Sequence, residues 1–295
     1  MSIWEAILLG VVQGLTEFLP ISSTAHLFVA RKLLGHDHPE DAFTVVIQLG
    51  TLVAVFWYFR DDIAAILRAV WDDVKTRRFA GSPDSRLAWL IVLGTIPGGL
   101  AGLVLKKWLK ATFYNVPAMA VVAIVFALLM AAAEWWAHRQ QRRGVPRREE
   151  KQIGVADALW VGVWQALALM PGGSRSGCTI SGGLFAGLTR PAAARFSFLL
   201  SLPIMLAAGL KELYDEYKKL RHPVDGEPAS LFASGDQVLA LIVGTAVAAI
   251  VGYLSIAWLL HFLKRYSTGV FIGYRLILGA VLLALVMGGW LSGGR

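Results

Sequence analysis

The sequence contains a single cysteine, Cys178, among its 295 residues. One thiol excludes an internal disulfide and a metal site built from several cysteines. The N-terminal segment MSIWEAILLG lacks the basic stretch that begins a secretory signal peptide, so we expect it to remain in the mature protein. In contrast, 56% of the residues are hydrophobic and 11 are Trp, which is unusual for a soluble globular domain. The composition therefore predicts a polytopic membrane protein.

The formal charge of +8 comes mainly from the connections between apolar runs and does not indicate a nucleic-acid partner. Lys and Arg lie mainly in short connections between apolar runs, as in the cytoplasmic loops of membrane proteins. Segments 60–86 and 138–152 each carry six of them, so we place both segments in the cytoplasm and both termini outside. Segment 211–236, expected outside, has four basic residues that acidic residues offset.

Six apolar runs approach the roughly 20 residues that a membrane-spanning helix needs. Segments 3–34 and 155–189 are also apolar, but Pro20-Ile21-Ser22-Ser23 and Pro171-Gly172-Gly173-Ser174 interrupt them. Irregular backbone at membrane depth is tolerated only where protein or a wet cavity satisfies its polar groups. Each interrupted segment therefore predicts a re-entrant helix-loop-helix pair within an all-α integral membrane fold. The six expected crossings are 43–59, 87–105, 116–136, 196–213, 238–260 and 269–290.

The two halves of the sequence resemble each other. GVVQGLTEFLP, FTVVIQLGTL and LIVLGT recur about 150 residues later as GVWQALALMP, FSFLLSLPIM and LIVGT, which indicates duplication of one unit. A unit with one re-entrant pair and three crossings has an odd number of crossings, so the second copy is inverted and the two breaks face each other near the midplane. The first half, 1–137, and the second half, 154–295, flank the basic linker 138–153 within a single membrane domain.

Gln13 and Glu17, before the first break, are candidate cation ligands. They stand four residues apart on one helix face, where an amide oxygen and a carboxylate can converge on a hard cation. A single carboxylate suffices for Mg²⁺ when substrate phosphates complete the octahedron. The alternative for this pair is a set of structural hydrogen bonds between helices.

Hydroxyl groups and an imidazole follow the first break. Ser22, Ser23 and Thr24 lie at a helix start, and Ser22 is expected only to cap that helix. Ser23 and His26 are three residues apart, which suits a nucleophile with its base, or a phosphate donor beside an acid. A purely structural role is the alternative for His26.

The second break has the composition of an anion-binding loop. Gly172 and Gly173 permit close approach of the backbone, and Ser174 and Ser176 supply hydroxyl groups. Arg175 offers a planar guanidinium suited to phosphate oxygens, and the following turn exposes the amides of a helix N-terminus. An arginine within apolar sequence is rarely structural unless it snorkels to the membrane surface.

Three other sites have lower priority. Segment 36–41, HDHPED, has metal-ligand composition, but its polar setting favours a solvated turn. Arg190, next to Pro191, fits either a snorkelling arginine at the membrane boundary or a phosphate ligand. Arg275 lies inside the last apolar run, and the sequence identifies no partner for it.

These motifs resemble those of the bacterial undecaprenyl-diphosphate phosphatases of the bacitracin-resistance type, over nearly the whole chain. The family motif (E/Q)xxxE is present as Gln13 and Glu17, with Gln removing one negative charge, and the family's serine and histidine map to Ser23 and His26. The motif PGxSRSxxT is present as Pro171, Gly172, Ser174, Arg175, Ser176 and Thr179.

The resemblance implies hydrolysis of undecaprenyl diphosphate to undecaprenyl phosphate at the extracytoplasmic side of the bacterial inner membrane. It implies Mg²⁺ or Ca²⁺ held by Gln13 and Glu17, with Ser23 as the nucleophile or the residue that orients water. It also implies His26 as base and then acid. Arg175 and segment 172–179 would bind the phosphoryl group, together with Thr24.

Two other functions compete with this one. Inverted repeats with broken helices are typical of secondary transporters, so a transporter or flippase of a polyprenyl phosphate is the main alternative. A lipid phosphatase of the acid-phosphatase superfamily is excluded, since the motif set KxxxxxxRP, PSGH and SRxxxxxHxxxD is missing. The sequence leaves the oligomeric state open, a homodimer included.

Overall fold

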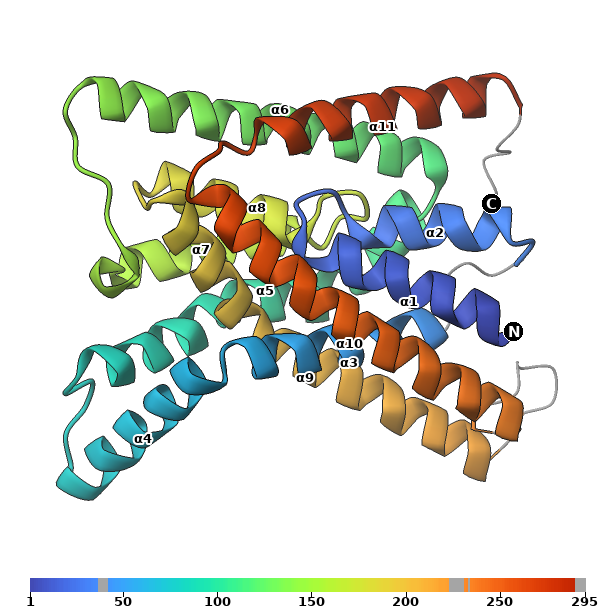
Figure 1. The fold of residues 1–295 in the computed structure, drawn as a ribbon, viewed down its shortest axis with the longest axis horizontal. Helices are drawn as coiled ribbons and strands as arrows, with labels where there is room; N and C mark the ends of the chain where they lie inside the picture. Colours follow the sequence, from blue (N-terminus) through green and yellow to red (C-terminus); the bar gives the residue numbers. More distant parts are fainter. Residues whose placement is uncertain (37–41, 223–230, 233, 290–295) are drawn as a thin grey trace.

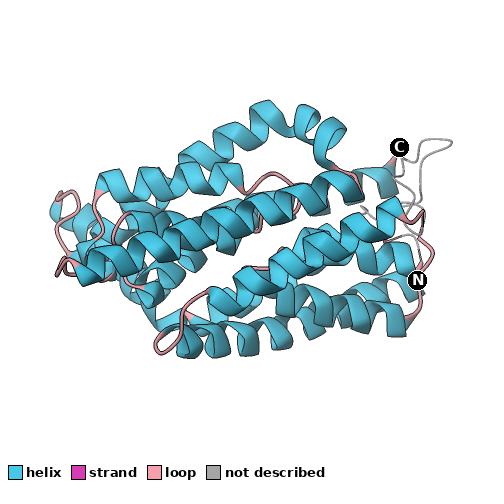
Figure 2. Cartoon of the chain, turned by 90° about the horizontal axis from the view of Figure 1, so that it is seen from above, coloured by secondary structure: helices cyan, strands magenta, loops and turns pink. Residues whose placement is uncertain are grey.

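The computed structural model describes residues 1–36, 42–222, 231–232 and 234–289. Within these residues the chain forms eleven α-helices and one 3-10 helix, joined by short connections (Figures 1 and 2). The predicted all-α membrane fold is therefore confirmed. The helices are α1 (Ile3–Phe18), α2 (Ser23–Leu33), α3 (Ala42–Tyr58), α4 (Arg60–Thr76), α5 (Pro83–Phe113), α6 (Val116–Arg142), η1 (Glu150–Gln152), α7 (Val155–Leu167), α8 (Arg175–Phe185), α9 (Arg190–Arg221), α10 (Gly235–Leu263) and α11 (Gly269–Met287).

Side-chain caps determine where the long helices begin. Ser82 accepts a hydrogen bond from the amide of Ser85, and Ser234 accepts one from Gln237, both at 3.2 Å. Asn115 caps α6 in the same way. A cap satisfies amide groups that have no partner within the first helical turn. Polar residues of the connections therefore fix the starts of α5, α6 and α10.

Five of the six predicted crossings correspond to single helices of spanning length, and the sixth corresponds to part of a bent helix pair. Within the described residues, α5, α6, α9, α10 and α11 are each long and apolar enough to cross a membrane. The remaining span, α3, meets this test only together with α4, from which it is separated by a bend of 74° at Phe59. The two interrupted segments form the pairs α1–α2 and α7–α8, as predicted.

The polar loop expected over 60–86 is largely a helix. In α4, Ile63 and Ile66 pack against the core, whereas Leu67 and Trp71 remain exposed. Apolar residues at this spacing are typical of an amphipathic helix. The prediction of a loop is wrong because it was based on the charges of the segment, whereas the helical spacing of the apolar residues determines the structure.

The two sequence repeats occupy equivalent places in the bundle. The caps Ser82 and Ser234 are 152 residues apart, and so are Ser22 and Ser174, which cap α2 and α8. Helix α1 packs along α10, and its counterpart α7 packs along α5. In Figure 1, α6 and α11 run in opposite directions along the top, as inversion of the second unit requires. Each half packs on the other, so the halves form one bundle.

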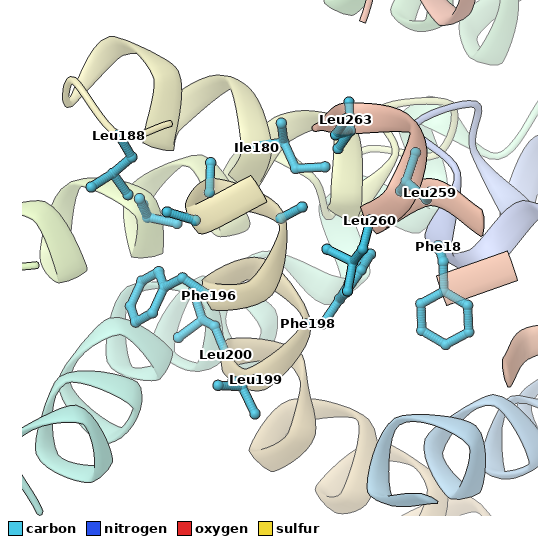
Figure 3. Packing of buried hydrophobic residues seen from close by; sticks show 14 of the residues in the cluster. Phe18, Ile180, Leu188, Phe196, Phe198, Leu199, Leu200, Leu259, Leu260 and Leu263 are labelled. Carbon is cyan, nitrogen blue, oxygen red and sulfur yellow. The ribbon is translucent and has the colours of Figure 1, made fainter. Parts of the chain in front are cut away.

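The largest cluster of buried apolar residues in the described structure includes side chains of α8, α9 and α10 (Figure 3). Ile180, Phe198 and Leu259 are almost completely buried there. Phe18, the last residue of α1, packs edge-on against Phe198, with the ring centroids 5.4 Å apart. The core therefore fixes the end of α1 and the body of α8, the helices that carry the two breaks.

The basic segments gather at one end of the bundle. In Figure 1 the turn between α4 and α5 and the linker after α6 lie on the left, opposite the N-terminus. Arg148 of the linker binds both carboxylate oxygens of Asp157 in α7, each at 2.7 Å. The hydrogen bond to Asp157 raises the pKa of the Arg148 guanidinium. Arg147 donates to the carbonyl of Leu188 at 3.0 Å, so the linker is held against the second half.

Candidate active site

The two breaks meet near the centre of the bundle. Loop 1, residues 19–22, joins α1 to α2, and loop 2, residues 168–174, joins α7 to α8 (Figure 1). The Ser176 hydroxyl donates to the Leu19 carbonyl at 3.0 Å. Arg175 Nη2 lies 2.7 Å from Glu17 Oε1. Both contacts join the first repeat to the second, which confirms that the breaks face each other.

Each loop ends in a serine with left-handed backbone. The φ angle is 76° at Ser22 and 67° at Ser174. Their hydroxyls cap the following helices, with Ser22 accepting from Ala25 at 3.5 Å and Ser174 from Gly177 at 3.2 Å. Left-handed backbone is unfavourable for a residue with a side chain, and such strain concentrates at functional sites. The capping role expected for Ser22 is confirmed, and Ser174 has the same role.

Glu17 connects side chains from three helices. Oε1 accepts from Arg175, whereas Oε2 accepts from Ser23 Oγ at 2.8 Å and from Gln13 Nε2 at 3.1 Å. Glu17 is only 7% exposed, and an unpaired carboxylate at membrane depth would be strongly unfavourable. The structure thus brings Gln13, Glu17, Ser23 and Arg175, all predicted site residues, into one cluster.

This cluster fits a divalent cation only as a site shared with substrate. It offers one carboxylate, one amide and one hydroxyl, and in the described ranges no group of three or more His, Cys, Asp or Glu could hold a metal. Arg175 already compensates the charge of Glu17. Because Mg²⁺ readily takes phosphate oxygens as ligands, the donor set suits a cation that a phosphate-bearing substrate helps to bind.

His26 has partners other than Ser23. Nδ1 lies 2.7 Å from the Ser22 carbonyl oxygen, and Nε2 lies 2.6 Å from the Tyr274 hydroxyl. A carbonyl only accepts, so Nδ1 carries the hydrogen and Nε2 accepts from Tyr274. The Ser23 hydroxyl donates to Glu17. The sequence did not identify Tyr274, whose only signal was a polar group within the last apolar run.

Gly172 is required by packing against α6. Its φ is +94°, and a Cβ atom would lie 2.5 Å from the carbonyl oxygen of Met119. At Gly173 a Cβ atom would lie 2.9 Å from the carbonyl oxygen of Met170. A side chain at either position would displace loop 2. The close approach at both glycines is to the protein's own backbone, and their role in binding phosphate stays a prediction.

The hydroxyls of Ser176 and Thr179 bind other parts of the protein. Ser176 reaches Leu19 as described, and Thr179 Oγ1 lies 2.7 Å from the Arg175 carbonyl and 2.5 Å from Ser197 Oγ. These contacts hold α8 against loop 1 and α9. Their role as phosphate ligands stays a prediction, as does that of Thr24, which is exposed at the start of α2.

Arg175 has donor capacity left for an anion. Nη2 is bonded to Glu17, whereas Nη1 is buried and has no hydrogen-bond partner in the described part of the chain. A buried donor without an acceptor is unfavourable, and a planar guanidinium matches phosphate oxygens. A phosphoryl group beside Arg175 would satisfy Nη1. Loop 2 and the start of α8 can therefore bind an anion.

Of the other candidates, Arg190 is paired with Glu134, and both roles suggested for it stay predictions. Its Nη2 lies 2.6 Å from Glu134 Oε2 and its Nε lies 3.0 Å from Oε1. Glu134 also accepts from the Thr268 amide at 2.8 Å, so the group joins α9, α6 and the start of α11. Of segment 36–41, residues 37–41 lie outside the described residues.

Comparison with known proteins gives a consistent match along the chain. A family model described as bacitracin resistance protein BacA matches residues 6–281. The chain is 45% identical over 292 residues to a protein named undecaprenyl-diphosphatase from Chlorobium phaeobacteroides (strain BS1), covering 99% of this chain and 100% of that one. It is 46% identical over 292 residues to one of the same name from Chloroherpeton thalassium (strain ATCC 35110 / GB-78), covering 99% of each.

Proposed function

The chain belongs to the bacitracin resistance protein family, and from this we propose that it hydrolyses undecaprenyl diphosphate to undecaprenyl phosphate and inorganic phosphate. Relatives at 45% and 46% identity carry the name undecaprenyl-diphosphatase. The observation that best supports the proposal is the 2.7 Å contact between Glu17 and Arg175, which joins the two repeats inside a membrane bundle. The reaction returns the lipid carrier to cell-wall synthesis and confers bacitracin resistance.

Arg175 is proposed to bind the terminal phosphoryl group. Its free Nη1 takes a phosphoryl oxygen, and the guanidinium opposes the charge that builds on the equatorial oxygens during transfer. The apolar helices hold the prenyl chain, so only the diphosphate meets polar protein.

Ser23 is proposed as the nucleophile, with Glu17 as its base. The Ser23 hydroxyl lies 2.8 Å from Glu17, which takes its proton as Oγ bonds to the terminal phosphorus. The bond from that phosphorus to the bridging oxygen breaks, and undecaprenyl phosphate leaves. Water then attacks the phosphoserine and gives a proton to His26. Glu17 returns its proton to Ser23 Oγ as the bond from Oγ to phosphorus breaks and inorganic phosphate departs.

A divalent cation, Mg²⁺ or Ca²⁺, would be held by Glu17 and Gln13 together with oxygens of the diphosphate. Its chemistry would be to neutralise the diphosphate charge. Because position 13 is Gln and not Glu, the protein contributes one negative charge fewer to this site.

The active site is proposed to open to the extracytoplasmic side of the bacterial inner membrane. The basic linker and the turn between α4 and α5 lie at one end of the bundle and the N-terminus at the other (Figure 1). Basic loops favour the cytoplasm, which leaves the termini outside.

The test is phosphate release from a polyprenyl diphosphate by the full chain purified in detergent. We expect Glu17→Ala and Arg175→Ala to lower kcat/KM by about 10²-fold or more. The first removes the proposed base and cation ligand, and the second removes the positive charge that opposes the charge of the transferred group. Circular dichroism and thermal unfolding check that both variants fold. A transporter could not show activity in detergent, so the absence of phosphate release by the wild type would favour the transporter alternative.

A further inference from the structure

Arg275 is a fully buried arginine whose described hydrogen bonds all go to backbone carbonyls. The residue lies in α11 with 0% of its surface exposed. Nη2 lies 2.8 Å from the Gly172 oxygen, and Nη1 lies 3.3 Å from the Pro20 oxygen. Nε lies 3.3 Å from the Ala123 oxygen in α6. A buried guanidinium without a carboxylate is unfavourable at membrane depth, so its presence indicates a function.

The two loop carbonyls that Arg275 binds are the same position in the two repeats. Pro20 and Gly172 are 152 residues apart, and each lies two residues before the strained serine that caps the next helix. One guanidinium therefore spans loop 1 and loop 2 at equivalent points. Its fixed planar geometry can keep two acceptors at a set separation, which a single ammonium group cannot do.

The loop positions that Arg275 binds are close to the reacting groups. Glu17 lies three residues before Pro20, and Arg175 lies three residues after Gly172. The neighbour of Arg275 on α11, Tyr274, binds His26 at 2.6 Å. Helix α11 thus contacts both loops and the imidazole.

We propose that Arg275 is a positioning residue that holds loops 1 and 2 at the separation at which Glu17 and Arg175 meet. This role rests on the function proposed above for its effect on rate, but the fixing of the loops is a structural statement that can be measured without turnover. Arg275 does not bind substrate in this proposal; it acts through Glu17 and Arg175.

The first measurement is hydrogen–deuterium exchange of the full chain in detergent, followed by mass spectrometry of loop peptides. In Arg275→Gln we expect exchange in both loops to rise about tenfold, because each loop loses a hydrogen bond to a charged donor. Leu282→Ala, which removes a buried side chain elsewhere in α11, is the control and should leave loop exchange unchanged. Unchanged exchange in either loop of Arg275→Gln would overturn the proposal.

The second measurement is a double-mutant cycle on phosphate release. Arg275→Gln should lower kcat/KM by about 10²-fold in the wild-type background, as small misplacements of reacting groups do. In the Arg175→Ala background, Arg275→Gln should lower kcat/KM by less than about threefold further, because the contact between Glu17 and Arg175 that Arg275 positions is already lost. A full, multiplicative loss in both backgrounds would mean a general folding defect and would reject the proposal.

Arg275→Lys provides a second variant that keeps the charge. It should retain the fold and still show raised exchange in at least one loop, because an ammonium lacks the planar fork. If Arg275→Gln fails to fold, Arg275→Lys takes its place in the exchange measurement and in the double-mutant cycle. A wild-type protein that releases no phosphate would refute the proposed function, whereas the exchange data would still test the loop contacts of Arg275.

Discussion

The Glu17 carboxylate is the central acceptor of the candidate site, because its two oxygens accept hydrogen bonds from three side chains. The spacing of Gln13 and Glu17 in the sequence predicted that these two would converge. The partner of Ser23 could not be predicted in the same way. Because His26 is three residues from Ser23, the sequence predicted that the two would pair. In the structure, α1 packs against α2 and places Glu17 next to the Ser23 hydroxyl instead.

Replacing Gln13 with Glu tests the shared cation site. A second carboxylate beside Glu17 should lower the half-maximal Mg²⁺ concentration for phosphate release by about tenfold, because ligand charge sets affinity for hard cations. Chelator should abolish wild-type activity, and added Mg²⁺ or Ca²⁺ should restore it. Gln141→Glu, at an exposed position, is the matched control. Identical cation dependence of the Gln13 variant and the wild type would argue against Gln13 as a ligand.

Replacing Gly172 with Ala tests the close approach of loop 2 to α6. The added Cβ would lie 2.5 Å from the Met119 oxygen at a φ of +94°, so we expect a loss of about 3 kcal/mol in stability together with loss of activity. Gly99→Ala in α5 is the control, because nothing lies within 4 Å of its Cβ position. Thermal unfolding measures the stability of both variants. Equal melting temperatures of Gly172→Ala and Gly99→Ala would contradict this explanation of Gly172.

At the scale of elements, the sequence predicted the two broken segments and the six crossings, because proline, glycine and serine within apolar runs are strong local signals. It did not predict α4, whose charges resembled those of a loop. The bend of 74° between α3 and α4 also has no local signal, since Phe59 is an ordinary apolar residue. Such a bend depends on what α4 packs against.

The linker is an element whose docking can be tested separately. Asp157→Asn removes the charge that Arg148 binds with two hydrogen bonds of 2.7 Å, but keeps an acceptor for the Gly154 amide. We expect tryptic cleavage after the linker residues 142–151 to become about tenfold faster, because local opening exposes them. Asp236→Asn, at an exposed first turn, is the control. Unchanged cleavage in Asp157→Asn would show that the linker is held by other contacts.

At the scale of the whole molecule, the internal repeat predicted that the breaks would face each other, and this much of the site followed from sequence. The roles of Tyr274 and Arg275 did not follow, because their partners come from segments more than 100 residues away. Glu134 is bound by Arg190, 56 residues away, and by Thr268, 134 residues away. Only packing of the inverted halves shows that Arg275 binds both loops.

Orientation in the membrane can be tested by labelling intact cells. The single native thiol, Cys178, is buried and should not react. A membrane-impermeant maleimide should label Ser2→Cys but not Arg143→Cys, because basic segments remain in the cytoplasm. Permeabilised cells should label both and so confirm that each thiol is accessible. Labelling of Arg143→Cys in intact cells would reverse the proposed orientation.

The strained serines have one more implication. Ser23 follows Ser22 as Arg175 follows Ser174, so the nucleophile proposed here and the anion-binding guanidinium occupy equivalent positions in the two repeats. A two-fold dimer of identical units would have the same side chain at both positions. Because the two units are fused in one chain, one position can carry the attacking group and the other the group that stabilises charge. The asymmetry of the chemistry therefore depends on both repeats belonging to a single polypeptide.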